Sequence, residues 1–256
     1  MVWLFVRLGV LHELAYAGNL IVQVVSSSIG LTASLIFLAA IFAHTDTLAG
    51  WRPAELVAVL GAFFLLNGVL GTVVQPSLQG FIADVRQGAL DFTLTKPWDA
   101  QVLVSIKRVD VWKLVDAGLG LVLLVVAVVQ LDQRVGPAQA AGFVVTLVAG
   151  GATIYSCCLI LATLAFWFIR VDNVLIVLLT FWEAGRWPVD VYPLWLRSTL
   201  TFLVPIAFAT TVPAQALVGR LTPATLLVAI AVAAALLAIS RVVWLRGLRR
   251  YSGASA

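Results

Sequence analysis

The chain has 256 residues, of which 62 % are hydrophobic and only 11 % are charged. An ordinary soluble domain is about 45–50 % apolar and about 25 % charged, so this composition excludes a soluble enzyme and indicates a protein surrounded by lipid. The net charge of +4 is accounted for by basic residues held against anionic lipid and needs no nucleic-acid partner.

Residues 1–16 differ from the rest of the chain. Four apolar residues between Trp3 and Leu14 recur at helical spacing, with Arg7, His12 and Glu13 on other faces. This pattern predicts an amphipathic helix lying on the inner leaflet; the alternative is that it extends the first span. His12 and Glu13 interrupt the apolar run that a cleaved signal peptide requires, so no such signal is expected.

Five apolar segments reach the length of about 20 residues that spans a bilayer. They lie near residues 18–43, 55–76, 114–131, 138–169 and 222–243. A sixth, near 171–184, is short and is interrupted from Glu183 onwards.

The stretch 185–220 contains a further apolar run, near 189–218, that is broken by Pro193, Pro205 and Pro213. A proline removes a backbone donor and clashes with the preceding turn, so we expect a broken, partly re-entrant helical segment between the fifth and sixth helices. Such backbone must be covered by protein or line water. The expected fold is an all-α polytopic membrane protein with six transmembrane helices, forming a single transmembrane domain over 1–256.

The distribution of Lys and Arg predicts the orientation. With both termini and the 77–113 loop inside, eleven basic residues lie in the cytoplasm and five outside, which favours N-in and C-in. The inner set is Arg7, Arg86, Lys96, Lys107, Arg108, Lys113, Arg170, Arg241, Arg246, Arg249 and Arg250. The outer set is Arg52, Arg134, Arg186, Arg197 and Arg220.

The 77–113 loop concentrates charge in an otherwise apolar chain. It holds nine of the 28 charged residues, namely Asp84, Arg86, Asp91, Lys96, Asp99, Lys107, Arg108, Asp110 and Lys113. No soluble domain surrounds it. We therefore expect this loop to be offered to a partner in water.

Residues suited to catalysis are scarce. His12 and His44 fall at opposite ends of the first span, so they cannot share a metal. Cys157 and Cys158 are adjacent in mid-membrane, which is typical of small packing residues. No Gly-Lys step exists, so a phosphate-binding loop is absent. We expect no catalytic residue, metal site or bound cofactor in this chain.

Polar side chains form stripes within two spans. Gln23, Ser27 and Ser34 fall on one face of the first helix, and Asn67 and Gln75 lie two turns apart on the second. Small and polar residues let membrane helices pack closely, which is one interpretation. The other is that these five residues line a substrate path.

Two acidic residues lie near helix ends. Asp110, Lys113 and Asp116 are spaced three residues apart, which predicts a ladder of charges at the inner interface. The alternative is a proton relay through Asp116 or Glu183, because ionisable residues inside a membrane are typical of proton-coupled carriers.

The loop segment ADVRQGALDFTLTKPWDAQ resembles the segment between the second and third helices of ABC exporter permeases of the second type. The matching residues are Val85, Arg86, Gly88, Leu90, Asp91, Leu94, Lys96 and Pro97. Thr93 and Thr95 depart from the family, where large apolar residues are commoner. The amphipathic start, the Pro-rich stretch from Tyr192 to Pro213 and the number of spans also fit the small six-helix permeases encoded beside a separate ATPase.

The resemblance implies that this loop forms a coupling helix docked on a cytoplasmic ATP-binding cassette ATPase, which binds ATP and Mg itself. The implied coupling residues are Asp84, Arg86, Gly88, Leu90, Asp91, Lys96, Pro97, Trp98 and Asp99. Pro97 would stand at the start of the helix, Gly88 would permit a tight turn, and Trp98 and Val102 would be the apolar anchor. The alternative is a solvated interfacial loop.

Two classes of function follow. The first is a transport subunit of an ABC exporter in a bacterial plasma membrane, paired with a second copy of itself or a paralogous permease. The second is a self-sufficient membrane protein, either a proton-coupled carrier or a lipid-modifying enzyme. Trp167, Trp182, Trp187 and Trp195 favour an amphiphilic substrate in either case.

Overall fold

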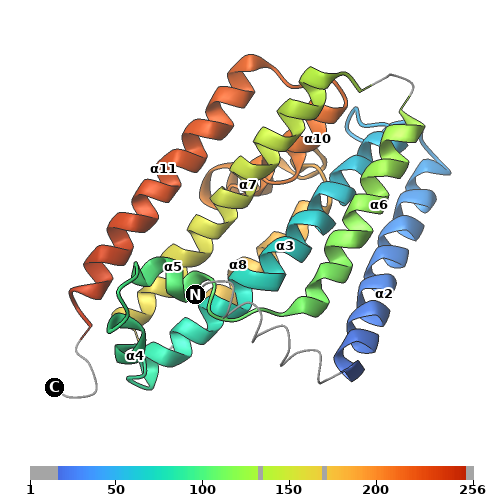
Figure 1. Ribbon diagram of the computed structural model, residues 1–256. Helices are drawn as coiled ribbons and strands as arrows, with labels where there is room; N and C mark the ends of the chain where they lie inside the picture. The colour runs from blue at the N-terminus through green and yellow to red at the C-terminus, as the bar shows by residue number, and fades with distance from the viewer. Residues whose placement is uncertain (1–16, 132–134, 169–171, 252–256) are drawn as a thin grey trace.

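The computed structural model describes residues 17–131, 135–168 and 172–251 (Figure 1). Within them every regular element is helical, apart from one isolated bridge between Leu48 and Trp51. The long helices are α2 (Ala17–Phe42), α3 (Pro53–Arg86), α6 (Leu114–Gln130), α7 (Pro137–Thr163) and α11 (Pro223–Leu248). The amphipathic helix expected over 1–16 lies outside the described residues.

Five helices in the described part of the chain are long and apolar enough to cross a membrane, the α6 span including a 3-10 turn at Val111–Lys113. They confirm the five segments predicted at full length. The short segment predicted near 171–184 is α8 (Asp172–Trp182), which has 11 residues and ends directly before Glu183, and it is not among the helices long enough to cross a membrane. At 1.5 Å per residue α8 is about 16 Å long, half of the hydrocarbon thickness. A short 3-10 turn, Glu183–Arg186, then brings Gly185 against Ile206.

The break predicted at the prolines is present. Helix α9 (Leu194–Ser198) continues as a π-helical turn, Thr199–Leu203. The chain then bends by 75° into a 3-10 turn, Ile206–Phe208, and α10 (Thr211–Leu217). If this bent pair is counted as one span, the described residues hold six.

The irregular backbone at the bend is covered by protein, as expected for a non-helical segment at membrane depth. Ile206 and Ala209 are fully buried. Gly150 of α7 lies so close that a Cβ there would contact the backbone of Ala209. Helix α7 therefore covers the bend.

Helix α3 is the centre of the bundle, between α6 and α7 (Figure 1). Its contact with α6 is made through glycines. A methyl group at Gly68 would overlap the backbone of Ala117, and one at Gly120 would overlap the backbone nitrogen of Leu65. Small residues at such contacts let membrane helices approach closely.

The sequence placed the end of the second span at residue 76, with a loop from 77, and this boundary is wrong. Helix α3 continues through Pro76 to Arg86. Its 34 residues make it about 51 Å long, well beyond the hydrocarbon core. Packing explains the extension, because Phe81 is buried with its ring centroid 5.2 Å from Trp244 and 5.4 Å from Phe166.

Figure 1 shows which segments lie at the same end of the bundle as the polar loop. The start of α2 and the end of α11 lie at the same end of the molecule as the short helices α4 (Asp91–Leu94) and α5 (Ala100–Ser105) (Figure 1). The connections α2–α3 and α10–α11 lie at the opposite end. The start of α2 and the end of α11 therefore lie at the same end of the bundle as the loop.

The glycine contact between α3 and α6 predicts a sharp difference between two residues of one helix. Gly120→Ala should destabilise the protein by about 1–3 kcal/mol or more, because its methyl group meets backbone that cannot repack. Gly118→Ala is the control, since a Cβ there meets nothing within 4 Å, and it should be neutral or slightly stabilising. Thermal unfolding in detergent measures both; equal melting temperatures would contradict the close contact.

Candidate functional site

The loop between α3 and α6 begins with a tight turn. Gly88 has φ +68°, in the left-handed region that glycine adopts without steric cost. The amide of Ala89 donates to the carbonyl of Asp84 across 2.8 Å, so the chain reverses directly after α3. This is the turn expected at Gly88.

Helix α5 is capped by an aspartate. The Asp99 carboxylate accepts hydrogen bonds from the amides of Gln101 at 2.9 Å and Val102 at 3.3 Å, which satisfies donors that lack helical partners. The helix therefore begins at Ala100, three residues after Pro97. Asp91 lies in the first turn of α4 and is half-buried.

The loop is fastened to three long helices. Two guanidinium nitrogens of Arg241, in α11, donate hydrogen bonds to the Asp99 carboxylate at 2.6 and 3.1 Å. Ser105 hydrogen-bonds Tyr155 of α7 at 2.8 Å. The hydroxyl of Ser77, in α3, donates to the carbonyl of Arg108 at 2.7 Å and accepts from its amide at 2.9 Å.

An ion pair closes the base of the loop. Lys107 lies 2.6 Å from the buried carboxylate of Asp84, and Arg108 lies 3.8 Å from it. Asp84, near the end of α3, therefore connects the start of the loop to residues near its end. The Lys107 side chain is therefore turned partly towards the bundle.

The other face of the loop presents apolar side chains to the surroundings. Trp98 is 57 % exposed, Val102 52 % and Phe92 76 %. Trp98 and Val102 are the residues expected as the apolar anchor. The exposed Phe92 was not predicted from the motif. Leu90 is fully buried and packs in the hydrophobic core. Arg86 and Pro97 are exposed, and Lys96 is half-exposed.

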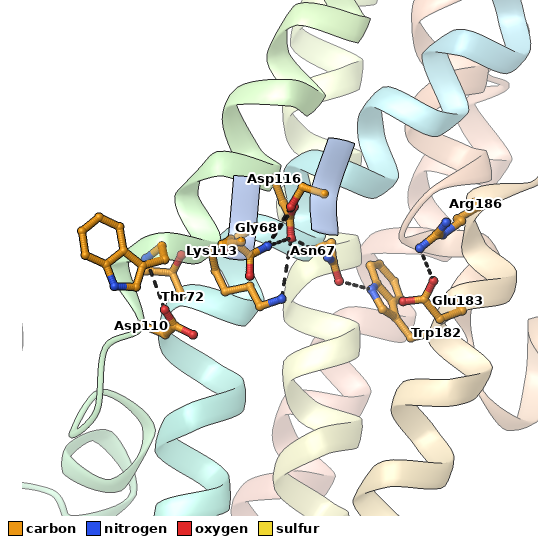
Figure 2. A network of polar contacts seen from close by, with 12 residues as sticks. Asn67, Gly68, Thr72, Asp110, Lys113, Asp116, Trp182, Glu183 and Arg186 are labelled. Atoms are coloured by element: carbon orange, nitrogen blue, oxygen red, sulfur yellow. Dashed lines mark hydrogen bonds and ion pairs between the residues drawn. The ribbon is translucent and has the colours of Figure 1, made fainter. Parts of the chain in front are cut away.

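A second group of polar residues lies between the long helices (Figure 2). Its centre is Asp116 of α6, which is 3 % exposed. The Ser27 hydroxyl donates to this carboxylate. Further donors are the Asn67 amide at 3.1 Å and the Gln23 amide at 3.3 and 3.4 Å.

The network extends from Asn67 to α8. The Asn67 oxygen accepts a hydrogen bond from the indole nitrogen of Trp182 at 3.0 Å, and the Trp182 ring stacks on Phe63 at 5.2 Å. Asp116 thus joins α2, α3 and α6 directly and α8 through one intermediate. We call Gln23, Ser27, Asn67, Asp116 and Trp182 the Asp116 network.

The charge ladder is present in part. Lys113 lies 3.9 Å from Asp116, as the spacing predicted, but Asp110 instead caps its own turn by accepting from the amide of Trp112 at 3.2 Å. The spacing of residues along α6 did not predict the neutral donors that reach Asp116 from α2 and α3. The signal for them was the α2 stripe, whose amide and hydroxyl groups require partners in lipid.

A separate contact lies further along α2. Arg186 pairs with Glu183 at 2.6 Å, reaches the Ser34 hydroxyl at 3.5 Å, and lies over the Phe63 ring at 5.3 Å. Ser34 therefore faces the bundle like Gln23 and Ser27. Glu183 belongs to this contact and not to the Asp116 network. The Gln75 side chain makes no hydrogen bond to any described residue and joins neither group.

The opposite end of the bundle is also held by charges. Glu55 of α3 is 1 % exposed and receives two bonds from Arg220, at 2.8 and 2.9 Å. Asp190 pairs with Arg197 at 2.6 Å and accepts from the indole of Trp51 at 3.2 Å. These contacts tie the α2–α3 connection to the re-entrant segment.

Taken together, the fold is that of a multi-pass membrane protein with an internal polar loop anchored to its spans. A family model for ABC-2 family transporter proteins matches residues 29–255, which is most of the chain. The chain therefore belongs to the ABC-2 transporter family. No curated protein and no solved structure matches it.

The family assignment confirms the resemblance read from the loop motif. The chain is the membrane component of an ABC transporter, a transport subunit and not an ATPase. Membership implies that it works with an ABC ATPase. Of the two classes of function left open by the sequence, the assignment selects the energy-coupled transport subunit.

The Asp116 network predicts unequal effects at two amides of α3. Asn67→Leu removes bonds to both Asp116 and Trp182, and hydrogen bonds between membrane helices average about 0.6 kcal/mol each. We expect a loss of about 1–2 kcal/mol in the free energy of unfolding. Gln75→Leu, the control, should stay within about 0.5 kcal/mol. Unfolding in mixed detergent measures both, and equal losses would show that the network does not stabilise the bundle.

The cap at Asp99 predicts a pH dependence. The Arg241 guanidinium holds the pKa of the Asp99 carboxyl below its ordinary value, against the opposing effect of burial. A lowered pKa in the folded state means that the contact is present above the ordinary pKa of about 3.9 and is lost as the pH falls through the folded value. Amide exchange of 99–105, corrected for intrinsic rates, should therefore stay slow at neutral pH.

Asp99→Asn should speed this exchange at neutral pH and make it insensitive to acid. Asp46→Asn, at an exposed aspartate of the α2–α3 connection, is the control and should leave the exchange of α5 unchanged. Equal protection of α5 in the Asp99→Asn variant and the parent would mean that the Arg241 ion pair does not hold the helix, because the asparagine oxygen can still cap it.

Proposed function

We propose that this chain forms the translocation path of an ABC exporter and is driven by a separate cytoplasmic ATPase that docks on α4 and α5. The observation that carries the proposal is the pairing of an exposed apolar face with a fastened base. Trp98, Val102 and Phe92 face outward, while Asp99 and Ser105 connect α5 to α11 and α7.

The exposed face suits a protein partner. Large aromatic side chains near the centre of an interface supply much of its binding energy. Phe92 lies in α4 and Trp98 in the connection between α4 and α5. Both stand beside charged residues of the loop, so they offer an apolar centre with a polar rim. The implied coupling residues Arg86, Lys96 and Pro97 belong to the rim of this surface. The implied coupling residues Gly88, Leu90, Asp84 and Asp91 hold the loop that carries it.

The fastened base supplies a route for movement. A displacement of α5 by the ATPase would act on Arg241 and Tyr155, and through them on α11 and α7. Because interfaces between packed helices have discrete arrangements and do not deform continuously, a shift of the loop is converted into a shift of whole spans. ATP and Mg are bound by the ATPase in this scheme, not by this chain.

The polar side of α2 supports the path. Gln23, Ser27, Ser34 and Asn67 meet charged groups between helices, and Gln75 continues the α3 side towards the loop. We place the path along this side, completed by a second copy of the chain or a paralogous permease and surrounded by membrane lipid. The loop and the ends of α2 and α11 then face the cytoplasm of a bacterial cell.

Trp98→Ala tests the docking surface. Truncation of a buried aromatic anchor costs about 2 kcal/mol or more, which is about thirtyfold in affinity. We expect normal insertion, loss of most co-purifying ATPase, and loss of ATP-driven transport.

Trp195→Ala is the matched control, because Trp195 is similarly exposed but lies in α9, whose Arg197 pairs with Asp190 beside Trp51 at the other end of the bundle. It should retain the ATPase. Retention of the ATPase by Trp98→Ala with transport intact would leave the loop as an interfacial linker. Loss of the ATPase in Trp195→Ala alone would reverse the proposed orientation.

A further inference from the structure

A groove lies on the re-entrant segment, away from the Asp116 network and the coupling loop. It has a volume of about 610 Å³ and is formed by the π-helical turn, α10 and the first turns of α11. Pockets that hold small molecules are commonly about 300–1,000 Å³. The groove is therefore large enough to hold much of a lipid-sized molecule.

The lining divides into an apolar and a polar part. Phe202, Phe208, Val212 and Val228 supply apolar surface. Phe202 is 84 % exposed and its neighbour Leu203 76 %, so this end faces hydrocarbon in a membrane. π-helical turns are rare and occur often at functional sites, and here the turn carries both of these residues.

The polar part has unused hydrogen-bond donors. Both oxygens of Asp190 are occupied, one by Arg197 and one by Trp51. Arg197 carries five N–H donors, is about half-exposed, and contacts no other acceptor among the described residues. The side-chain amide of Gln215 also makes no hydrogen bond within the described ranges, and Gln215 lines the same groove.

We propose that this groove binds an amphiphile with a hydrocarbon chain and an anionic head, the chain along Phe202 and Val228 and the head at Arg197. Guanidinium donors match the oxygens of a phosphate or carboxylate in geometry and charge. Asp190 orients Arg197 without consuming all of its donors. The inference rests on the proposed function and extends it: the groove is a binding site for the transported class of substrate that lies outside the path along α2.

Photo-crosslinking tests the site. The full chain with its ATPase is placed in bilayer discs containing a phosphatidic acid probe with a diazirine in its acyl chain, or the matching phosphatidylcholine probe. Labelled peptides are identified by mass spectrometry. We expect the anionic probe to label residues 198–212 and 223–228 about tenfold more than the zwitterionic one, and both probes to label α2 around Ile29 equally. Equal labelling of the groove by both probes would show ordinary annular lipid and overturn the proposal.

Three variants sharpen the test. Val228→Trp fills the groove and should remove labelling by both probes. Arg197→Gln should remove only the preference for the anionic head. Asp190→Asn frees Arg197 and should keep or increase that preference. If Asp190→Asn and Arg197→Gln lose labelling alike, the ion pair merely holds the segment in place and the head-group site is wrong.

Transport separates this inference from the proposed function. ATP-driven movement of the anionic probe between leaflets is expected in the parent and lost in Val228→Trp with the ATPase still bound. If the groove is labelled but the probe is not moved while ATP is hydrolysed, the substrate class is wrong. If Trp98→Ala retains ATPase and transport, the docking proposal fails, whereas the labelling of the groove is unaffected.

Discussion

The close approach of α3 and α6 sets the position of almost everything else in the described structure. Lipid provides no hydrophobic drive for helix association, so the contact depends on backbones that glycine allows to touch. Gly68 lies against Ala117, and their sequence neighbours are Asn67 and Asp116. The glycine contact therefore brings the amide and the carboxylate within hydrogen-bonding distance, and α2 and α8 attach to that pair.

Polar contacts then fix the less regular parts to this pair of helices. At one end Glu55 of α3 holds Arg220, and at the other Asp84 of α3 holds Lys107. Both carboxylates are buried and both reach residues far away in the chain. A long central helix with an acid near each end thus anchors the re-entrant segment and the coupling loop to the same rigid body.

The sequence predicted those features that depend on composition or on a single residue type. Apolar length identified five spans, the prolines identified the bend, and Gly88 identified the turn. Features that depend on tertiary contact were missed. Helix α3 continues past residue 76 because Phe81 has Trp244 to pack against, and Asp116 collects donors from α2 and α3 that no spacing along α6 reveals. The coupling and path residues read from the motif and the stripes remain predictions, although Gln75 stands apart from the others.

Asp99 performs two tasks with one carboxylate, and this has a consequence for biosynthesis. Helix α5 has only six residues, too few to be stable alone in water, and its cap is held in place by Arg241. Arg241 is 142 positions later in the chain, in a helix that leaves the ribosome well after the loop. The loop consequently acquires its final shape only after α11 has been inserted, so a nascent chain that still lacks α11 does not yet hold the cap of α5 in place.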